Sequence, residues 1–176
     1  GNLLGAAQSG HIAAIGFGLY CQLLRRTIAR FKGEAPPLLV DVDLALDFLD
    51  FSPGAIDPDS SACLPYTYVE DEAHRMTLHR RIAEAVAVKE VHVLKAELTD
   101  RYGKPPPAVL RLLRLAELRV LAAQKKIGRI ETRENKIHFY QQRERSPLHV
   151  KGHLPLLKGK TAEQRLTSVF HALQAL

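Results

Sequence analysis

Residues 109–126, VLRLLRLAELRVLAAQKK, constrain the fold of this chain more than any other stretch. Leucine, valine and alanine recur there at every third or fourth position, with arginine and glutamate between them, which is the period of an amphipathic helix. Pro105–Pro107 precede the pattern and suit a helix start, and Gly128 follows it and is expected to end it. Because the sequence has no Trp and only 6% aromatic residues, the core that this helix joins must be aliphatic.

Helical signals recur in four other segments. Residues 11–32 carry apolar side chains at helical spacing, and Ser9 with Gly10 is expected to form the turn or N-cap before them. Acidic residues 70–72 stand where a helix start favours negative charge. The remaining signals are an apolar stripe over 88–102 that ends at Gly103, and a capping box, Thr161 with Gln164, for a last helix.

Three short segments have the alternation of β-strands. Residues 40–48 alternate apolar side chains with aspartate, and residues 128–132 and 136–141 are joined through RENK as a hairpin. The sequence therefore predicts an α+β fold. It is a helix-rich domain with a small, mainly antiparallel sheet, preceded by a loop and a long amphipathic helix.

Composition and the start of the chain bear on location. Contents of 46% hydrophobic and 25% charged residues are those of a globular protein and disfavour the disordered and membrane classes. Residues 1–24 carry no formal charge, but glycines and polar side chains interrupt them, so no membrane-spanning helix is expected. There is no initiator Met and no signal-peptide pattern, and Cys21 and Cys63 fit buried thiols. We therefore expect a cytoplasmic fragment cut from a longer protein.

The net charge of +6 is unevenly distributed along the chain. Residues 1–35 carry +3, residues 36–72 carry −9 with no Lys or Arg, and residues 73–176 carry +12. The acidic segment can pair with the basic remainder or present a separate face to a different partner. A free-standing DNA-binding module that uses the basic helical region stays open as an alternative. Its Lys and Arg are nevertheless spread as on solvated helix faces, and no nucleic-acid-binding motif is recognisable.

No pattern in the sequence indicates a catalytic centre. GNLLGAAQSGH lacks the Lys and the preceding strand of a phosphate-binding loop. Ser9 and His11 lack a nucleophile elbow and an orienting acid. His149 and His153 are four apart, but a glycine between them and prolines on both sides disfavour a zinc site, so no metal is expected. From its residues alone, the chain is a regulatory or interaction module.

Three stretches carry a resemblance to a known family. GNLLGAAQSGHIAAIGFGLYCQLL resembles the segment that follows the motor of bacterial transcription-repair coupling factor (Mfd). LPYTYVEDEAHRMTLHRRIA and ELTDRYGKPP resemble two later motifs of that family, in the same order. The resemblance runs from Gly1 to about Lys126 and thins out in the hairpin and tail. Three linked motifs make it specific, because the related recombination helicase RecG shares only the first.

The family is an ATP-driven double-stranded DNA translocase that removes stalled RNA polymerase and recruits the excision-repair protein UvrA. The resemblance implies that residues 1–34 are the end of the translocation motif and a linking helix, with Gln8, Ser9 and Gly10 in the motif. It implies that residues 35–176 are the C-terminal regulatory domain. ATP and Mg²⁺ belong to motor lobes outside this sequence, so we expect no cofactor and no ATP hydrolysis in the chain itself.

The resemblance also implies a contact within the parent protein. In the family, the C-terminal domain folds back on an amino-terminal UvrB-like module and masks the UvrA-binding surface. Carboxylates of the motif matched by ELTDRYG are implicated in this contact, which implies interdomain residues Glu97, Asp100 and Arg101 here. Glu97 and Asp100 share a helix face because they stand at i and i+3. The alternative is that they are local partners of Arg101 and Lys104.

Overall fold

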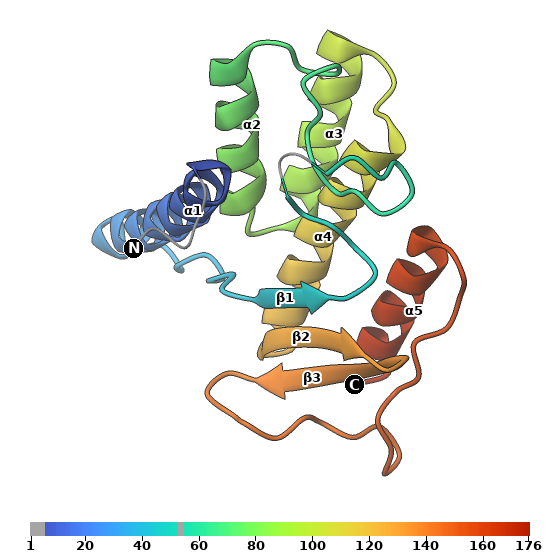
Figure 1. Ribbon diagram of the computed structural model, residues 1–176. Coiled ribbons are helices and arrows are strands. Elements are labelled where there is room, and N and C mark those ends of the chain that lie inside the picture. Colours follow the sequence, from blue (N-terminus) through green and yellow to red (C-terminus); the bar gives the residue numbers. More distant parts are fainter. Residues whose placement is uncertain (1–5, 53–54) are drawn as a thin grey trace.

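The computed structural model describes residues 6–52 and 55–176, with side chains described from Gly18 onward in that part. Five helices and three strands lie in these ranges (Figure 1). In chain order the elements are α1 (Ala6–Phe31), β1 (Asp43–Leu46), α2 (Glu72–Glu84), α3 (Val88–Tyr102), α4 (Pro107–Gln124), β2 (Ile127–Arg133), β3 (Lys136–Gln141) and α5 (Ala162–Gln174). The expected α+β class is confirmed.

The sheet is small and mixed, with strand order β1-β2-β3. β2 and β3 form the expected antiparallel hairpin, and its turn residues Glu134 and Asn135 both have positive φ. β1 instead runs parallel to β2, with Leu44 opposite Ile130. The expectation of a mainly antiparallel sheet thus holds for the hairpin alone. A parallel pair needs a long crossover, which α2, α3 and α4 provide here.

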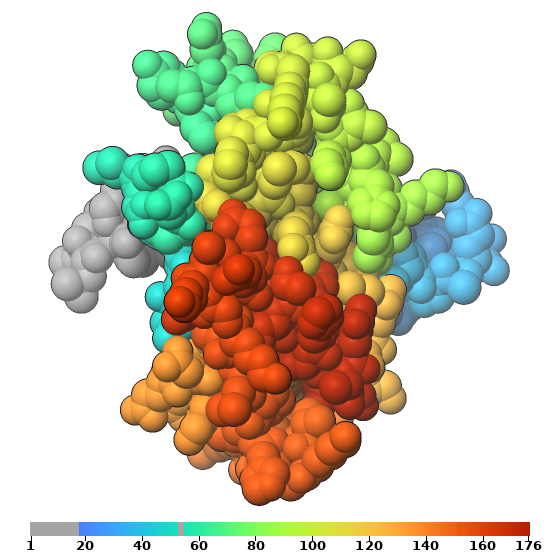
Figure 2. All heavy atoms as spheres, turned by 90° about the vertical axis from the view of Figure 1, so that its right-hand side faces the viewer, coloured from blue at the N-terminus to red at the C-terminus, as the bar shows by residue number. Residues whose placement is uncertain are grey.

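Helix α4 forms the centre of the molecule. Its Leu115 and Leu118 pack with the sheet and α5, whereas Val109 and Leu113 pack with α2 and α3. Figure 2 shows α5 lying across the middle of this face, with α2 and α3 above it and the segment between β3 and α5 below it. The dense apolar pattern of residues 109–126 therefore reflects a helix that is covered on several sides, because it contributes to three clusters of buried side chains.

The ends of α2, α3 and α5 agree with the sequence signals. The Asp71 side chain accepts a hydrogen bond from the backbone N–H of His74 at 2.7 Å and begins α2. Gly103 ends α3 with φ of 83°. Thr161 and Gln164 form the expected capping box of α5, with both reciprocal hydrogen bonds present. These short-range predictions are confirmed.

Two helix boundaries differ from expectation. α1 begins at Ala6, so Ser9 and Gly10 lie within the helix and do not form the turn before it. α4 ends at Gln124, and Lys126 has a φ of 59°, so the chain turns before Gly128. Gly128 lies in β2, where a Cβ would stand 3.0 Å from the Cγ atom of Gln142. This glycine permits a close approach of two chain segments and does not stop the helix.

Helix α1 is attached to the rest of the chain by small and buried polar groups. Gly18 lies against α2, where an added Cβ would be 3.0 Å from the Cβ of Ala83. Gln22 is only 2% exposed and hydrogen-bonds Val40 and Ala83. Of the two cysteines expected to be buried, Cys63 is buried, and Cys21 of α1 is partly buried.

Candidate protein-contact surface

One side of α3 carries an apolar side chain in line with two carboxylates. Val93, Glu97 and Asp100 stand at i, i+4 and i+7, which places them along one face of the helix. Val93 is 55% exposed, whereas Val91, Leu94 and Leu98 of the same helix are buried. We call Val93, Glu97 and Asp100 the α3 stripe. An exposed branched aliphatic side chain bordered by charges suits a protein contact.

Glu97 is already engaged within the domain. Arg81 of α2 donates two hydrogen bonds to its carboxylate, at 2.8 and 2.7 Å, in a bidentate pair. Arg101 stands 3.7 Å from the same carboxylate, one helical turn further on. The hydrogen bond from Arg81 lowers the pKa of Glu97, and the same hydrogen bond raises the pKa of Arg81. This pair holds α2 against α3 and fixes the orientation of the Glu97 carboxylate.

Asp100 differs from Glu97 in its surroundings. It is exposed, and in the described part of the chain no hydrogen bond or ion pair engages its carboxylate. Arg101 is directed to Glu97 and to the ring of Tyr102, whose centroid lies 5.4 Å from the guanidinium carbon. The structure therefore divides the three expected contact residues. Glu97 and Arg101 have local partners, as the alternative proposed, and Asp100 is available to a partner.

A hollow of about 490 Å³ adjoins the α3 stripe where α1, α2 and α3 meet. Across it, Arg25 of α1 binds Glu90 of α3 with an N–O distance of 2.9 Å. The other carboxylate oxygen of Glu90 accepts a hydrogen bond from the backbone N–H of Val86 at 2.9 Å. Glu90 therefore links the first turn of α3 to α1.

Sequence reasoning missed the contribution of four residues to this surface. Arg81 stands 16 positions before Glu97, and nothing in a single sequence pairs residues on different helices. The same holds for Arg25 and Glu90, which are 65 positions apart. Val93 did leave a signal, because it falls outside the apolar stripe of residues 88, 91, 94, 98 and 102.

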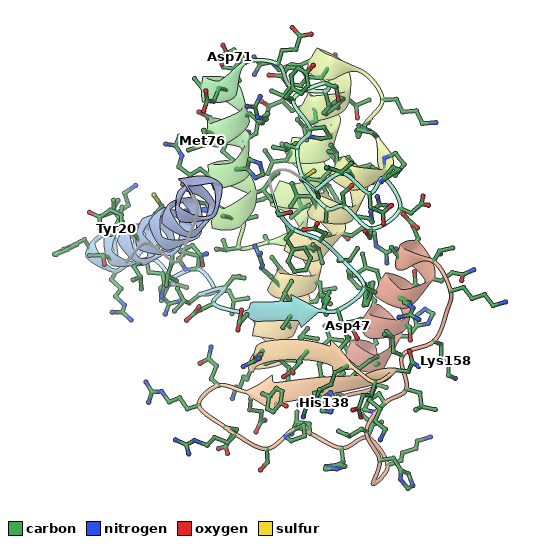
Figure 3. The ribbon with its side chains drawn as sticks, viewed as in Figure 1. Tyr20, Asp47, Asp71, Met76, His138 and Lys158 are labelled. Atoms are coloured by element: carbon green, nitrogen blue, oxygen red, sulfur yellow. The ribbon has the colours of Figure 1, made fainter. Side chains whose placement is uncertain are left out.

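The expected motif residues Gln8, Ser9 and Gly10 lie in the first turns of α1, and their side chains are outside the described part. The structure therefore does not test their role. Figure 3 shows Tyr20 further along α1 and Met76 on α2. Both are large side chains that are more than half exposed.

Several basic residues of the helical region are engaged inside the domain. Arg75 donates to the carbonyl oxygens of Val69 and Glu70, and Arg81 binds Glu97. Arg111 of α4 is 3% exposed and donates to the Ser61 carbonyl oxygen, to the Pro58 carbonyl oxygen and to Glu163. Arg114 lies over the ring of Phe170. The ion pairs of Arg81 and Arg111 offset part of the positive charge of the helices, so these two arginines do not favour the DNA-binding alternative.

The described residues also bear on other classes of function. No group of three His, Cys, Asp or Glu side chains is placed to hold a metal ion in residues 6–52 and 55–176. Over the same ranges, none of the helices has the length and apolar character needed to cross a membrane.

Fold and surface together define a small α+β domain with a mixed sheet and a charged helical face. Residues 59–150 match the family model described as the TRCF domain. The chain therefore belongs to the transcription-repair coupling factor family.

Curated relatives and a solved structure agree with this assignment. The transcription-repair-coupling factor of Myxococcus xanthus is 38% identical over 120 residues, which cover 68% of this chain and 9% of the relative. The transcription-repair-coupling factor of Escherichia coli is 33% identical over 134 residues, which cover 76% of this chain and 11% of the relative. The crystal structure of the C-terminal domain of transcription-repair coupling factor has the same fold, with a TM-score of 0.58 and 18% identity over 77% of this chain and 92% of that one. The chain spans about a tenth of the length of these relatives.

Proposed function

We propose that this chain is the C-terminal regulatory domain of a DNA translocase, and that the α3 stripe binds the UvrB-like amino-terminal module of the same protein. When bound, it masks the surface that UvrA recognises. The exposed Val93 in line with Glu97 and Asp100 is the observation that carries this proposal. Family membership and the shared fold support the broader assignment to transcription-repair coupling.

The three side chains of the α3 stripe have different roles in this contact. Val93 supplies the apolar centre, which loses water on binding and contributes to the affinity. Asp100 has no partner in the described domain, so it pairs with a basic group of the module and contributes to specificity. Glu97 is held by Arg81 and presents a fixed carboxylate edge, so little side-chain entropy is lost when the module docks.

The remaining activities of the family belong, on this proposal, to other parts of the parent protein. ATP and Mg²⁺ are bound by its motor, which also moves on double-stranded DNA and acts on RNA polymerase. The chain itself regulates the parent protein through its contact with the amino-terminal module, and it hydrolyses no ATP. A phosphate-release assay on the purified chain tests this point, and ATPase activity that copurifies with it would overturn the assignment of the chemistry to the motor.

The decisive experiment uses the full-length parent carrying Val93→Glu together with Asp100→Lys. Both side chains are exposed, so the variant keeps its fold while the contact is lost. UvrA should then bind the parent about tenfold more tightly, because loss of the contact exposes the UvrA-binding surface. A coupling between two binding events is typically of this size. The measurement is a binding titration with purified UvrA.

A control places the same aspartate-to-lysine substitution elsewhere on the surface. Asp59→Lys alters an exposed aspartate in the loop before α2 and should leave UvrA affinity unchanged. Equal affinity of wild type and of the Val93→Glu, Asp100→Lys variant would contradict the proposal. So would a tighter complex in both variants, since the effect would then follow net charge and not the α3 stripe.

A further inference from the structure

A second hollow lies away from the α3 stripe, between α1, β1 and α4. Its volume is about 430 Å³, within the range of small-molecule sites. Helix α1 contributes Leu19 and Gln22, and α4 contributes Leu112, Leu115 and Arg119. The remaining walls come from residues 40–44, Phe51 and Ala83.

Arg119 is the cation of this hollow, and it has no partner in the described ranges. Its side chain is partly buried, yet no carboxylate or carbonyl oxygen of residues 6–52 or 55–176 forms a hydrogen bond or ion pair with its guanidinium. Burial lowers the pKa of Arg119, and the negative charge of Asp43 acts in the opposite direction. A guanidinium withdrawn from water is costly unless an anion or acceptors replace the lost hydration.

Another arginine of the same helix shows how this fold satisfies a buried guanidinium. Arg111 stands two turns before Arg119 on α4 and binds two carbonyl oxygens and the Glu163 carboxylate. Within the described residues, a full set of acceptors surrounds the buried Arg111, and none is hydrogen-bonded to the partly buried Arg119. Arg111 is surrounded by protein, whereas Arg119 faces a hollow. A ligand in this hollow can therefore provide the hydrogen-bond acceptors for the Arg119 guanidinium.

The walls and rim restrict what that ligand can be. Val42, Leu44, Phe51 and Leu115 make much of the lining apolar. Asp41 and Asp43 are exposed and add two negative charges to the hollow. A doubly charged phosphate is repelled by both aspartates about twice as strongly as a singly charged group in the same place.

We propose that this hollow binds a singly charged carboxylate that carries an aliphatic group. The two carboxylate oxygens match the planar guanidinium of Arg119, and the hydrocarbon lies against the apolar wall. Such a group occurs on a small carboxylic acid and at the free C-terminus of a peptide that ends in an aliphatic residue. The site is separate from the α3 stripe, and its occupancy does not depend on the proposed masking of UvrA.

Titration of the ¹⁵N-labelled chain with valerate, followed by NMR, tests the site. Valerate should shift the Arg119 Nε–H signal and the amides of residues 40–44 in a saturable manner, with a millimolar dissociation constant. Valeramide has nearly the same shape without the charge and should bind at least about tenfold more weakly. Inorganic phosphate should produce no comparable shift at the same residues.

Variants separate the role of Arg119 from general effects. Arg119→Gln should weaken valerate binding about tenfold or more, whereas Arg133→Gln, at an exposed arginine of the hairpin, should leave it unchanged. Asp43→Asn keeps Arg119 and removes one rim charge, so valerate should bind more tightly and phosphate should begin to bind. This third variant tests the site even if Arg119→Gln unfolds the chain.

The two sources of the carboxylate are compared with short peptides ending in leucine. Tighter binding of a peptide with a free C-terminus than of valerate, with loss on C-terminal amidation, assigns the site to a partner's chain end. Equal binding of valerate and the peptide assigns it to small carboxylic acids. The proposal is overturned if valerate causes no saturable shift in the wild-type chain. It is also overturned if valeramide binds as well as valerate, or if Asp43→Asn leaves both anions unaffected.

Discussion

The side-chain amide of Gln22 pairs with both backbone hydrogen-bonding groups of Val40. Its Oε1 accepts from the Val40 N–H at 2.8 Å, and its Nε2 donates to the Val40 carbonyl oxygen at 3.1 Å. The same Nε2 donates to the carbonyl oxygen of Ala83 at 3.3 Å. One buried side chain of α1 thus holds the segment before β1 and the end of α2 together.

Replacing Gln22 by leucine should lower the free energy of unfolding by about 2–3 kcal/mol, because polar backbone groups of Val40 lose their partner while buried. Urea denaturation followed by circular dichroism measures the loss. Gln22→Glu keeps an acceptor for the Val40 N–H but loses the donors, so its loss should be similar or larger at neutral pH. A Gln22→Leu variant as stable as wild type would show that α1 does not depend on this contact.

Gly159 is a position where adding a single Cβ atom is expected to lower stability. Its φ is +110°, and an added Cβ would lie 2.5 Å from the Cβ of Gln164 and 3.0 Å from the Gln164 backbone carbon. Gly159→Ala should therefore destabilise the chain by about 2–3 kcal/mol and loosen the start of α5. Gly33→Ala is the control, because φ there is +71° with nothing within 4 Å, and it should cost only about 1 kcal/mol. Thermal melting compares the two, and equal losses would contradict the steric argument.

Arg111 binds three acceptors from two separate segments, and its removal should be among the most damaging single changes in the domain. We expect Arg111→Met to cost about 3–4 kcal/mol, because the loop at 58–61 loses its donors and Glu163 loses its partner. Arg114→Met on the same helix removes a contact with the Phe170 ring and one hydrogen bond at 3.2 Å, and should cost about 1 kcal/mol. Chemical denaturation gives both values, and a reversed order would refute this ranking.

The Arg81–Glu97 pair should make stability depend on acid pH. Because the pKa of Glu97 is lowered in the folded chain, its contribution is present above the ordinary value of 4.5 and is lost as pH falls through the folded value. Both side chains are about a third exposed, so the coupling energy should be only about 0.5–1 kcal/mol. A double-mutant cycle with Arg81→Gln and Glu97→Gln measures it at neutral pH and again at acid pH below the lowered pKa of Glu97, where it should vanish. A coupling that persists in acid would rule out this origin.

Local signals in the sequence were sufficient for most of the fold. Thr161 with Gln164, Asp71 and Gly103 act through neighbours within a few positions, so their effects could be predicted from spacing alone. The hairpin at 127–141 was predictable for the same reason. The parallel pairing of β1 with β2 could not be predicted in this way. The paired residues are 86 positions apart, and an alternation of apolar and polar side chains looks the same in a parallel and in an antiparallel strand.

The candidate surface shows the same division between features set by neighbours in the sequence and features set by long-range packing. Glu97 and Asp100 could be proposed from a family resemblance and placed on one face from helical spacing. That Arg81 binds Glu97 rather than Asp100 depends on how α2 packs on α3, which no local pattern specifies. The lack of a partner for Arg119 among the described residues was hidden for a related reason, since a sequence shows where an arginine is but not which acceptors the fold brings to it.

The parallel pairing also sets an order of events during synthesis. Asp43 lies opposite Arg129, so β1 has no strand to join until the ribosome has made the whole crossover and β2. During that interval, helices α2, α3 and α4 can pack on one another through nearby contacts, while residues 40–48 remain unpaired. The aspartates that alternate along this stretch keep it hydrated in the meantime and oppose association with other nascent chains. The acidic composition of this stretch thus protects β1 from association with other chains until β2 has been made.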